Sequence, residues 1–212
     1  MNRIKRLFVN ILTGRFDSVW YALWTRLRGL DLGVVSLQEL GLSPDRSKGH
    51  SNTGGPDLVR VFKSIEIPPG SRVVDLGSGK GGAIFSLSRF PFAEIVGVEI
   101  SEELVRIANA NTARLGLKNT SFYCSDASEF RDFDRFTHVY MANAFPLEVM
   151  RAVMDNLIAS LDRKPRPLTL IFESPFSLEN VINSELFRLE KEFRFRYRQP
   201  FFVYVHEVPR KV

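Results

Sequence analysis

The sequence has little cysteine and lacks long apolar runs. Its one cysteine, Cys124, excludes an intrachain disulfide and a cysteine-rich zinc site. No stretch of about 20 apolar residues is present, which is the length that a membrane-spanning helix requires. The first apolar stretch is interrupted by Asn10 and no small-residue cleavage site follows, so we expect no secretory signal. These absences predict a reducing compartment, and we expect a cytoplasmic location.

Net charge is also missing from most of the chain. The net charge of the 212 residues is +5. Residues 1–30 carry all of it, with the acid Asp17 and the basic residues Arg3, Lys5, Arg6, Arg15, Arg26 and Arg28. The remainder is neutral overall, so a nucleic acid is not an expected partner. The length favours one domain, residues 50–212, after an extension, residues 1–49.

Apolar residues recur at helical spacing in the extension. They predict two short amphipathic helices with basic polar faces, separated near Gly14 and ended by Gly29. The first contains Ile4, Leu7, Phe8, Ile11 and Leu12, and the second contains Phe16, Val19, Trp20, Leu23, Trp24 and Leu27. Three interpretations are open. The apolar stripes pack on the domain, form a lid or substrate-binding element, or bring residues 1–29 into peripheral contact with an anionic membrane.

Short apolar runs alternate with helical stretches after residue 70. We expect strands at residues 72–76, 93–100, 120–124, 137–142 and 168–172, and helices at 83–90, 102–115, 147–161 and 180–187. Residues 193–198 and 201–208 have no helix between them, so they predict an antiparallel hairpin. The pattern predicts an α/β fold in which a mostly parallel, Rossmann-like sheet is covered on both faces.

Polar residues stand at the carboxyl ends of four of these strands, where open α/β sheets bind ligands. They are Asp75, Glu99, Asp126 and Asn143. A glycine-rich turn, residues 77–82, follows the first strand and lets the backbone approach a ligand closely. The carboxylate of Glu99 can accept hydrogen bonds from both hydroxyls of a ribose, and that of Asp126 from the amine of adenine. Together they predict an adenosine-binding crevice.

The same glycines fit the dinucleotide pattern G-x-G-x-x-G, through Gly77, Gly79 and Gly82. Asp75 argues against a dinucleotide, because its carboxylate would repel a pyrophosphate at the tip of the first strand. A cationic sulfonium ligand with an amino group would instead favour a carboxylate there. The closing hairpin also differs from a dinucleotide-binding sheet.

These motifs resemble those of class I S-adenosylmethionine-dependent methyltransferases over residues 50–208. Residues 73–82 are similar to motif I, residues 98–101 to the ribose-binding motif and residues 124–127 to the adenine-binding motif. The resemblance implies a seven-stranded sheet and S-adenosyl-L-methionine as cofactor. The cofactor-binding residues that it implies are Asp75, Gly77, Ser78, Gly79, Gly81, Glu99, Ile100, Asp126, Ala127 and Asn143.

A narrower resemblance links the chain to non-SET lysine methyltransferases of the disruptor-of-telomeric-silencing type. It rests on residues 141–145, with Asn143 and Phe145, and on residues 173–176, Glu-Ser-Pro-Phe. Because an amine nucleophile must be oriented and kept from water, we expect the Asn143 carboxamide oxygen to accept a hydrogen bond from it, and Phe145 and Phe176 to wall a dry channel. The tyrosine that this family has upstream of motif I is absent, and residues 50–53, His-Ser-Asn-Thr, stand there instead.

The acceptor that we expect is therefore a protein lysine. A small molecule is the alternative, followed by a nucleic acid or a non-catalytic nucleotide-binding role. Whether His50, Thr53 or Glu173 lines the active site is open, and no metal is expected.

Further residues have structural interpretations. We expect Lys80 to be solvated and Cys124 to be a buried thiol. Alternation predicts a solvated basic face formed by Arg194, Arg196 and Arg198.

Overall fold

The computed structural model describes residues 16–41, 43–45, 52–142, 145–176, 185–196 and 198–208. The first of the two predicted amphipathic helices lies outside this part of the chain. The second is α2, Phe16–Leu27, and the short helix α3, Leu37–Leu40, follows it. None of the helices in the described residues is long and apolar enough to cross a membrane.

The described strands form one seven-stranded sheet in the order β3-β2-β1-β4-β5-β7-β6. Strands β1 to β5 run parallel, and β7 runs antiparallel to both β5 and β6. Their bounds are β1 Arg72–Leu76, β2 Glu94–Glu99, β3 Thr120–Cys124, β4 His138–Ala142, β5 Leu168–Glu173, β6 Arg188–Phe193 and β7 Phe201–His206. The predicted α/β, Rossmann-like fold with a C-terminal antiparallel hairpin is confirmed.

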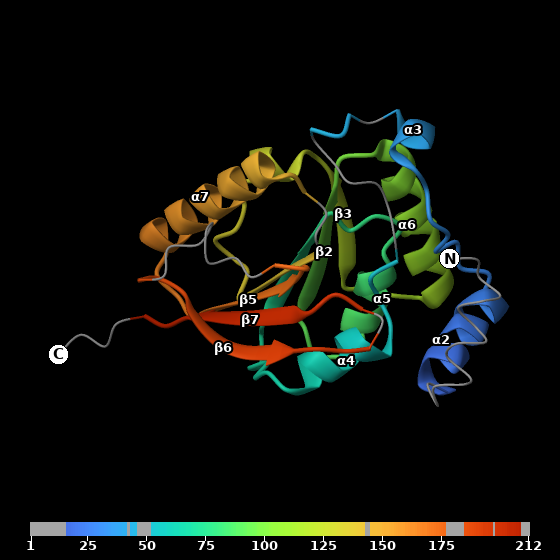
Figure 1. Cartoon of the computed structure of the whole chain (residues 1–212), viewed down its shortest axis with the longest axis horizontal. Helices are drawn as coiled ribbons and strands as arrows, with labels where there is room; N and C mark the ends of the chain where they lie inside the picture. The colour runs from blue at the N-terminus through green and yellow to red at the C-terminus, as the bar shows by residue number, and fades with distance from the viewer. Residues whose placement is uncertain are drawn as a thin grey trace.

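Helices cover both faces of the sheet because successive strand residues point to opposite sides. Val73 packs in one apolar cluster with α4, Pro56–Lys63, and α5, Gly82–Leu87. The next residue, Val74, packs in a second cluster with α7, Leu147–Arg163. Figure 1 shows α7 on one side of the sheet, with α5 and α6, Glu102–Leu115, on the other.

The bounds of α6 follow from its sequence. The hydroxyl oxygen of Ser101 accepts a hydrogen bond from the Leu104 N–H at 3.4 Å, which caps the first turn. Gly116 ends the helix in the left-handed conformation, at φ 66°. Both ends agree with the predicted helix.

The position of the C-terminal hairpin corrects a prediction. Its first strand is β6, Arg188–Phe193, whereas residues 194–196 and 198–200 lie in the connection to β7. The strand was missed because β6 is an edge strand of mostly charged residues, and edge strands carry such residues to prevent further pairing. The predicted helix over 180–187 is wrong at its end, since residues 185–186 form a turn. Its residues 180–184 lie outside the described part.

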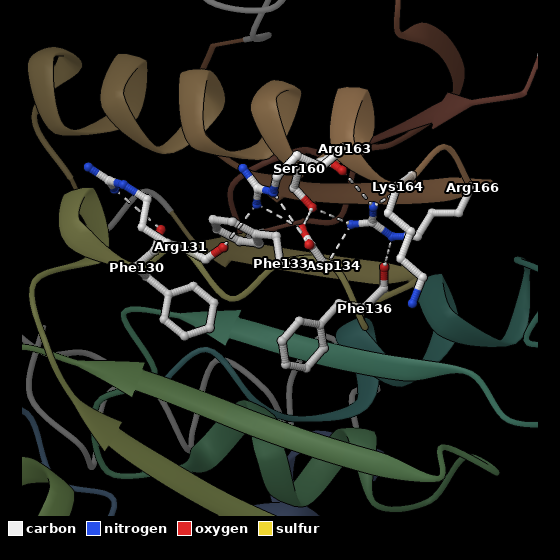
Figure 2. A network of polar contacts seen from close by, with 9 residues as sticks. All are labelled: Phe130, Arg131, Phe133, Asp134, Phe136, Ser160, Arg163, Lys164 and Arg166. Carbon is white, nitrogen blue, oxygen red and sulfur yellow. Dashed lines mark hydrogen bonds and ion pairs between the residues drawn. The ribbon is translucent and has the colours of Figure 1, made fainter.

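A polar network ties α7 to the segment before β4 (Figure 2). Asp134 accepts hydrogen bonds from the Ser160 hydroxyl at 2.6 Å and from Arg163 at 2.8 Å. Arg166 donates to the carbonyl oxygens of Phe133 and Phe136, both at 2.7 Å. Because these residues precede β4 and β5, the network anchors the amino ends of the strands, away from the predicted site.

One face of α2 packs on the body of the protein. The rings of Tyr21 and Trp24 stack on Phe85 of α5, with centroid distances of 5.8 and 4.7 Å. Asp17 forms an ion pair with Arg60 of α4. Within the predicted stripe, Trp24 packs on the domain, but Phe16, Trp20, Leu23 and Leu27 are exposed, so the packing interpretation is wrong for most of the stripe.

Candidate functional site

The loop between β1 and α5 depends on glycine. Gly77, Gly79 and Gly81 have φ angles of 74°, 53° and 80°, a region that other residues enter only with strain. The backbone N–H groups of Gly77 and Ser78 donate to the Val98 carbonyl at 2.8 and 3.1 Å. The predicted glycine-rich turn is thus held against the end of β2.

Asp75 is a buried carboxyl group at the tip of β1. Its side chain has 2% relative exposure, and its Oδ2 atom has no hydrogen-bond partner among the described residues. Burial raises the pKa of Asp75 to about 8, and the nearby Glu99 carboxylate adds to the increase. The buried Ser78 hydroxyl in the adjoining loop also lacks a partner there. A buried acceptor without a donor is uncommon, and a cationic ligand would satisfy it.

Glu99 ends β2 with its carboxylate held by the backbone. Oε2 accepts a hydrogen bond from the Gly79 N–H at 2.9 Å, and Oε1 accepts one from the Ser101 N–H at 3.0 Å. Burial raises the pKa of Glu99, and these backbone hydrogen bonds oppose that increase. Each carboxylate oxygen can accept a second hydrogen bond, so the group is oriented to receive two hydroxyls.

Asp126 and Ala127 follow β3. Asp126 Oδ1 accepts hydrogen bonds from the N–H and hydroxyl of Ser128 at 2.8 and 2.7 Å, so it caps the short helix η1, Ala127–Glu129. Ala127 is buried in the core beneath this turn. Ile100, between β2 and α6, is half-buried. Roles of these residues in cofactor binding remain predictions.

A segment that sequence reasoning did not assign lies against the glycine loop. Asn52 Oδ1 accepts a hydrogen bond from the Gly54 N–H at 3.0 Å, and Gly55 donates to the Ser86 hydroxyl of α5 at 2.8 Å. A side chain on Gly54 would collide with the backbone of Gly82. The available signal was Gly-Gly-Pro before an apolar run, since Pro56 occupies the first turn of α4.

Two buried polar side chains, Tyr140 and Glu173, meet the partly buried Arg198 at the ends of β4 and β5. The Tyr140 hydroxyl donates to Glu173 Oε2 at 2.8 Å, and Arg198 donates to both Glu173 oxygens at 2.7 and 2.8 Å. Arg198 also donates to the Thr53 carbonyl, which joins segment 52–55 to the sheet. Burial raises the pKa of Tyr140, and the Glu173 charge adds to it. Burial disfavours the charged form of Arg198, but the hydrogen bonds to Glu173 outweigh it and raise the Arg198 pKa.

The prediction of a solvated basic face is correct for Arg194 and Arg196, which are exposed, and wrong for Arg198. The Arg198 side chain is 14% exposed, because the chain turns inward toward Glu173 instead of continuing a strand. The Glu173 carboxylate already accepts three hydrogen bonds, so its position at the end of β5 does not leave it free as a base.

The residues predicted at the acceptor side have separate positions. Asn143 and His50 lie outside the described residues. Phe145 is 7% exposed and packs in the core cluster that contains α7, whereas Phe176 is 77% exposed. The roles of Asn143 and Phe145 in catalysis remain predictions.

Two further expectations are wrong, and both errors concern burial. Lys80 is 4% exposed, and its ammonium group forms an ion pair with Asp31 at 2.8 Å. Asn111 of α6 donates to the carbonyl oxygens of both residues at 2.9 Å. Cys124 is exposed because it ends an edge strand, β3. Across the residues described, no cluster of three or more histidine, cysteine, aspartate or glutamate side chains could hold a metal ion.

A family model described as a methyltransferase domain matches residues 67–191. The 23S rRNA (uracil(1939)-C(5))-methyltransferase RlmD of Shewanella amazonensis is 45% identical over 72 residues, which cover 34% of this chain and 16% of that protein. The protein-L-isoaspartate O-methyltransferase of Thermotoga maritima is 31% identical over 100 residues, which cover 44% of this chain and 32% of that protein. The chain thus spans less than half the length of these curated relatives.

Solved structures share the fold over most of the chain. The ribosomal protein L11 methylase of Lactobacillus delbrueckii subsp. bulgaricus has a TM-score of 0.58 at 18% identity, covering 78% of this chain and 83% of that one. An RNA methyltransferase of Salinibacter ruber, solved with S-adenosyl-L-homocysteine, has a TM-score of 0.55 at 18% identity, covering 76% of this chain and 95% of that one.

Proposed function

Because the chain belongs to the methyltransferase domain family, we propose that it is an S-adenosylmethionine-dependent methyltransferase that methylates the side-chain amine of a protein lysine. The cofactor supplies a methyl group already activated on a sulfonium sulfur. The protein's contribution is then mainly to bind, orient and exclude water.

The unpartnered Asp75 carboxylate is the observation that carries the cofactor site. It would accept hydrogen bonds from the amino group of the methionine moiety, beside the backbone of residues 77–81. Glu99 would accept the two ribose hydroxyls, because its oxygens are already oriented by Gly79 and Ser101. Asp126 and the Ala127 N–H would contact the adenine.

Calorimetric titration tests this assignment. S-adenosylmethionine and S-adenosylhomocysteine should bind with micromolar affinity, which is about −8 kcal/mol, and NADH should not bind. Binding of NADH alone would contradict the assigned contacts.

The acceptor proposal rests on the polar and aromatic residues that follow β4 and β5. Asn143 would accept a hydrogen bond from the incoming amine, and Phe145 would help to keep water from it. Relatives named as modifying proteins, such as protein-L-isoaspartate O-methyltransferase, are consistent with a protein acceptor. Several relatives are 23S rRNA enzymes, so RNA is the second candidate. Outside residues 1–30 the chain has no net charge, which disfavours RNA as the acceptor.

Labelling distinguishes the acceptors. The protein is incubated with methyl-tritiated cofactor and an extract of cells that lack it, and the protein, RNA and small-molecule fractions are counted. We expect the label in protein and, after acid hydrolysis, in methylated lysine. The Asp75→Ala variant is the control for enzyme-dependent transfer. Label that ribonuclease removes would identify RNA, instead of lysine, as the acceptor. Label confined to the small-molecule fraction would identify a small molecule.

A further inference from the structure

The helix α2 has an exposed apolar stripe. Phe16 is 69% exposed, Trp20 65%, Leu23 47% and Leu27 75%. Their spacing of four, three and four residues places them in one line along the helix. Four large apolar side chains in one line on the surface are more than the isolated exposed residue that soluble proteins commonly show.

The stripe faces away from the rest of the protein. Tyr21 and Trp24 stack on Phe85 of α5, and Thr25 is buried, so this side of α2 forms the contact with the body. At about 100° per residue, Tyr21 and Thr25 lie on the side of the helix opposite the line through Trp20 and Leu23. Figure 1 shows α2 at the outer edge of the molecule.

Positive charge lies beside this stripe. Residues 1–30 contain the whole net charge of +5. In the described part of this segment, Arg26 and Arg28 are exposed near the end of α2, one on each flank of the stripe. Arg28 lies over the Trp24 ring at 5.1 Å. The one acid of the segment, Asp17, is paired with Arg60, so it does not offset these charges.

The charge decides which occupant fits the stripe. A second copy of α2 in parallel would bring Arg26 and Arg28 of both copies together, and their repulsion would oppose this pairing. An anionic bilayer offers both an apolar layer for the four side chains and negative headgroups for the arginines. We propose that α2 binds in the plane of an anionic phospholipid surface and inserts Phe16, Trp20, Leu23 and Leu27.

The two tryptophans of the chain supply the test, because both lie on α2. In the Trp24→Phe variant, Trp20 is the only tryptophan and lies in the stripe. Its emission should shift to shorter wavelength with vesicles containing phosphatidylglycerol, and not with pure phosphatidylcholine vesicles. In the matched Trp20→Phe variant, the remaining Trp24 faces α5, so its shift should be much smaller.

Vesicle sedimentation of the full chain gives the second measurement. The Leu23→Glu variant should bind phosphatidylglycerol vesicles at least about tenfold more weakly, since a carboxylate would enter the apolar layer. The control is Leu147→Glu, which charges an apolar side chain that is 49% exposed at the start of α7. It should bind as the unchanged chain does. The thermal unfolding temperature should be unaltered in both variants, which shows that they fold.

Three outcomes would overturn the proposal. One is an unchanged Trp20 spectrum with anionic vesicles, and another is a Leu23→Glu variant that sediments normally. The third is a Trp20 that is protected from iodide quenching in buffer, because the stripe would then be covered by another part of the chain or by a second copy. None of these measurements uses the cofactor, so they succeed or fail independently of the proposed methyl transfer.

Discussion

The Asp75 carboxyl group couples the stability of the protein to pH. Its pKa is raised from 3.8 to about 8 in the folded state. Between these values the unfolded chain loses the proton while the folded protein keeps it, so stability falls as pH rises, by at most about 1.4 kcal/mol per pH unit. The Asp75→Asn variant lacks this titration. Its unfolding free energy should exceed that of the unchanged protein by an amount that grows from pH 5 to 8 and then levels off.

Urea unfolding at several pH values measures this difference. The Asp155→Asn variant is a control, because Asp155 is an exposed carboxylate on α7, and its difference from the unchanged protein should not grow between pH 5 and 8. An Asp75→Asn variant that is less stable at pH 8 would show that the carboxylate has a stabilising partner.

Glu99 should contribute to the affinity for the cofactor and not only to the stability of the folded protein. In the Glu99→Gln variant, an amide NH₂ would face either the Gly79 N–H or the Ser101 N–H, and one acceptor for the ribose would be lost. We expect cofactor binding to weaken by about 2 kcal/mol or more in calorimetry. Glu102→Gln, in the exposed first turn of α6, is the matched control and should bind normally. If the two variants bind the cofactor equally well, Glu99 is not part of the cofactor site.

At this scale the sequence was informative where local chemistry is distinctive. Asp75 and Glu99 could be assigned because glycines and strand ends mark their positions. The burial of Lys80 and Arg198 could not, because their partners Asp31 and Glu173 lie 49 and 25 residues away in the chain. A long-range ion pair leaves no periodic signal in the sequence.

Strand β2 approaches the glycine loop so closely that a side chain cannot be accommodated at Gly97. A Cβ there would lie 2.6 Å from the Ser78 hydroxyl and 2.5 Å from the Phe122 ring. The Gly97→Ala variant should lose about 1–3 kcal/mol of stability and bind the cofactor more weakly, because the loop must move. Gly116→Ala is the control. Its φ of 66° strains alanine, but its surroundings are open, so stability should fall without a change in affinity. Equal affinity in both variants would contradict the coupling of β2 to the loop.

The Glu173–Arg198 pair joins β5 to the connection between β6 and β7. The Glu173→Gln variant leaves the Arg198 charge buried without its partner, which should cost about 3–5 kcal/mol in urea unfolding. Adding Arg198→Met removes that charge as well, so the double variant should regain part of the loss. The Arg198→Met variant is measured as well. If the double variant loses as much stability as the two single variants together, the side chains do not interact in solution.

Elements were predictable to different degrees for related reasons. Buried parallel strands such as β1 and β4 are short apolar runs, and their bounds agree with the pattern to within a residue. Strand β6 was displaced in the prediction because its charged residues imitate a loop, while Phe193 and Phe195 beyond its centre imitate a strand. Helix α4 was missed because only eight residues carry its pattern.

For the whole molecule, the order of strands and helices was enough to predict the fold, because parallel strands joined by helices allow few topologies. The acceptor side was not predictable to the same extent. It is built from connections after β4 and β5, where side chains are placed by contacts between distant segments, such as Arg198 with Thr53. The family resemblance therefore predicted the cofactor side of the site in more detail than the acceptor side.

Cofactor binding should stabilise the entire fold in a pH-dependent way. At a concentration of about 100 times Kd, a ligand that binds only the folded state adds about 2.7 kcal/mol. For a chain of this size that corresponds to a rise in Tm of about 5–10 °C. Below pH 8, the cationic amino group of the cofactor must displace the proton of Asp75. The affinity for the cofactor should therefore fall by at most about tenfold for each unit by which the pH is lowered. Above pH 8 Asp75 is already ionised, so it no longer contributes to this dependence.

Calorimetry in two buffers of different ionisation enthalpy measures the proton released at pH 7. The unchanged protein should release close to one proton when S-adenosylmethionine or S-adenosylhomocysteine binds, because both carry the amino group. The Asp75→Asn variant should bind more weakly and release none. A proton release that persists in this variant would show that a group other than Asp75 gives up the proton. Asp75 would then lose its assigned role as the partner of the amino group.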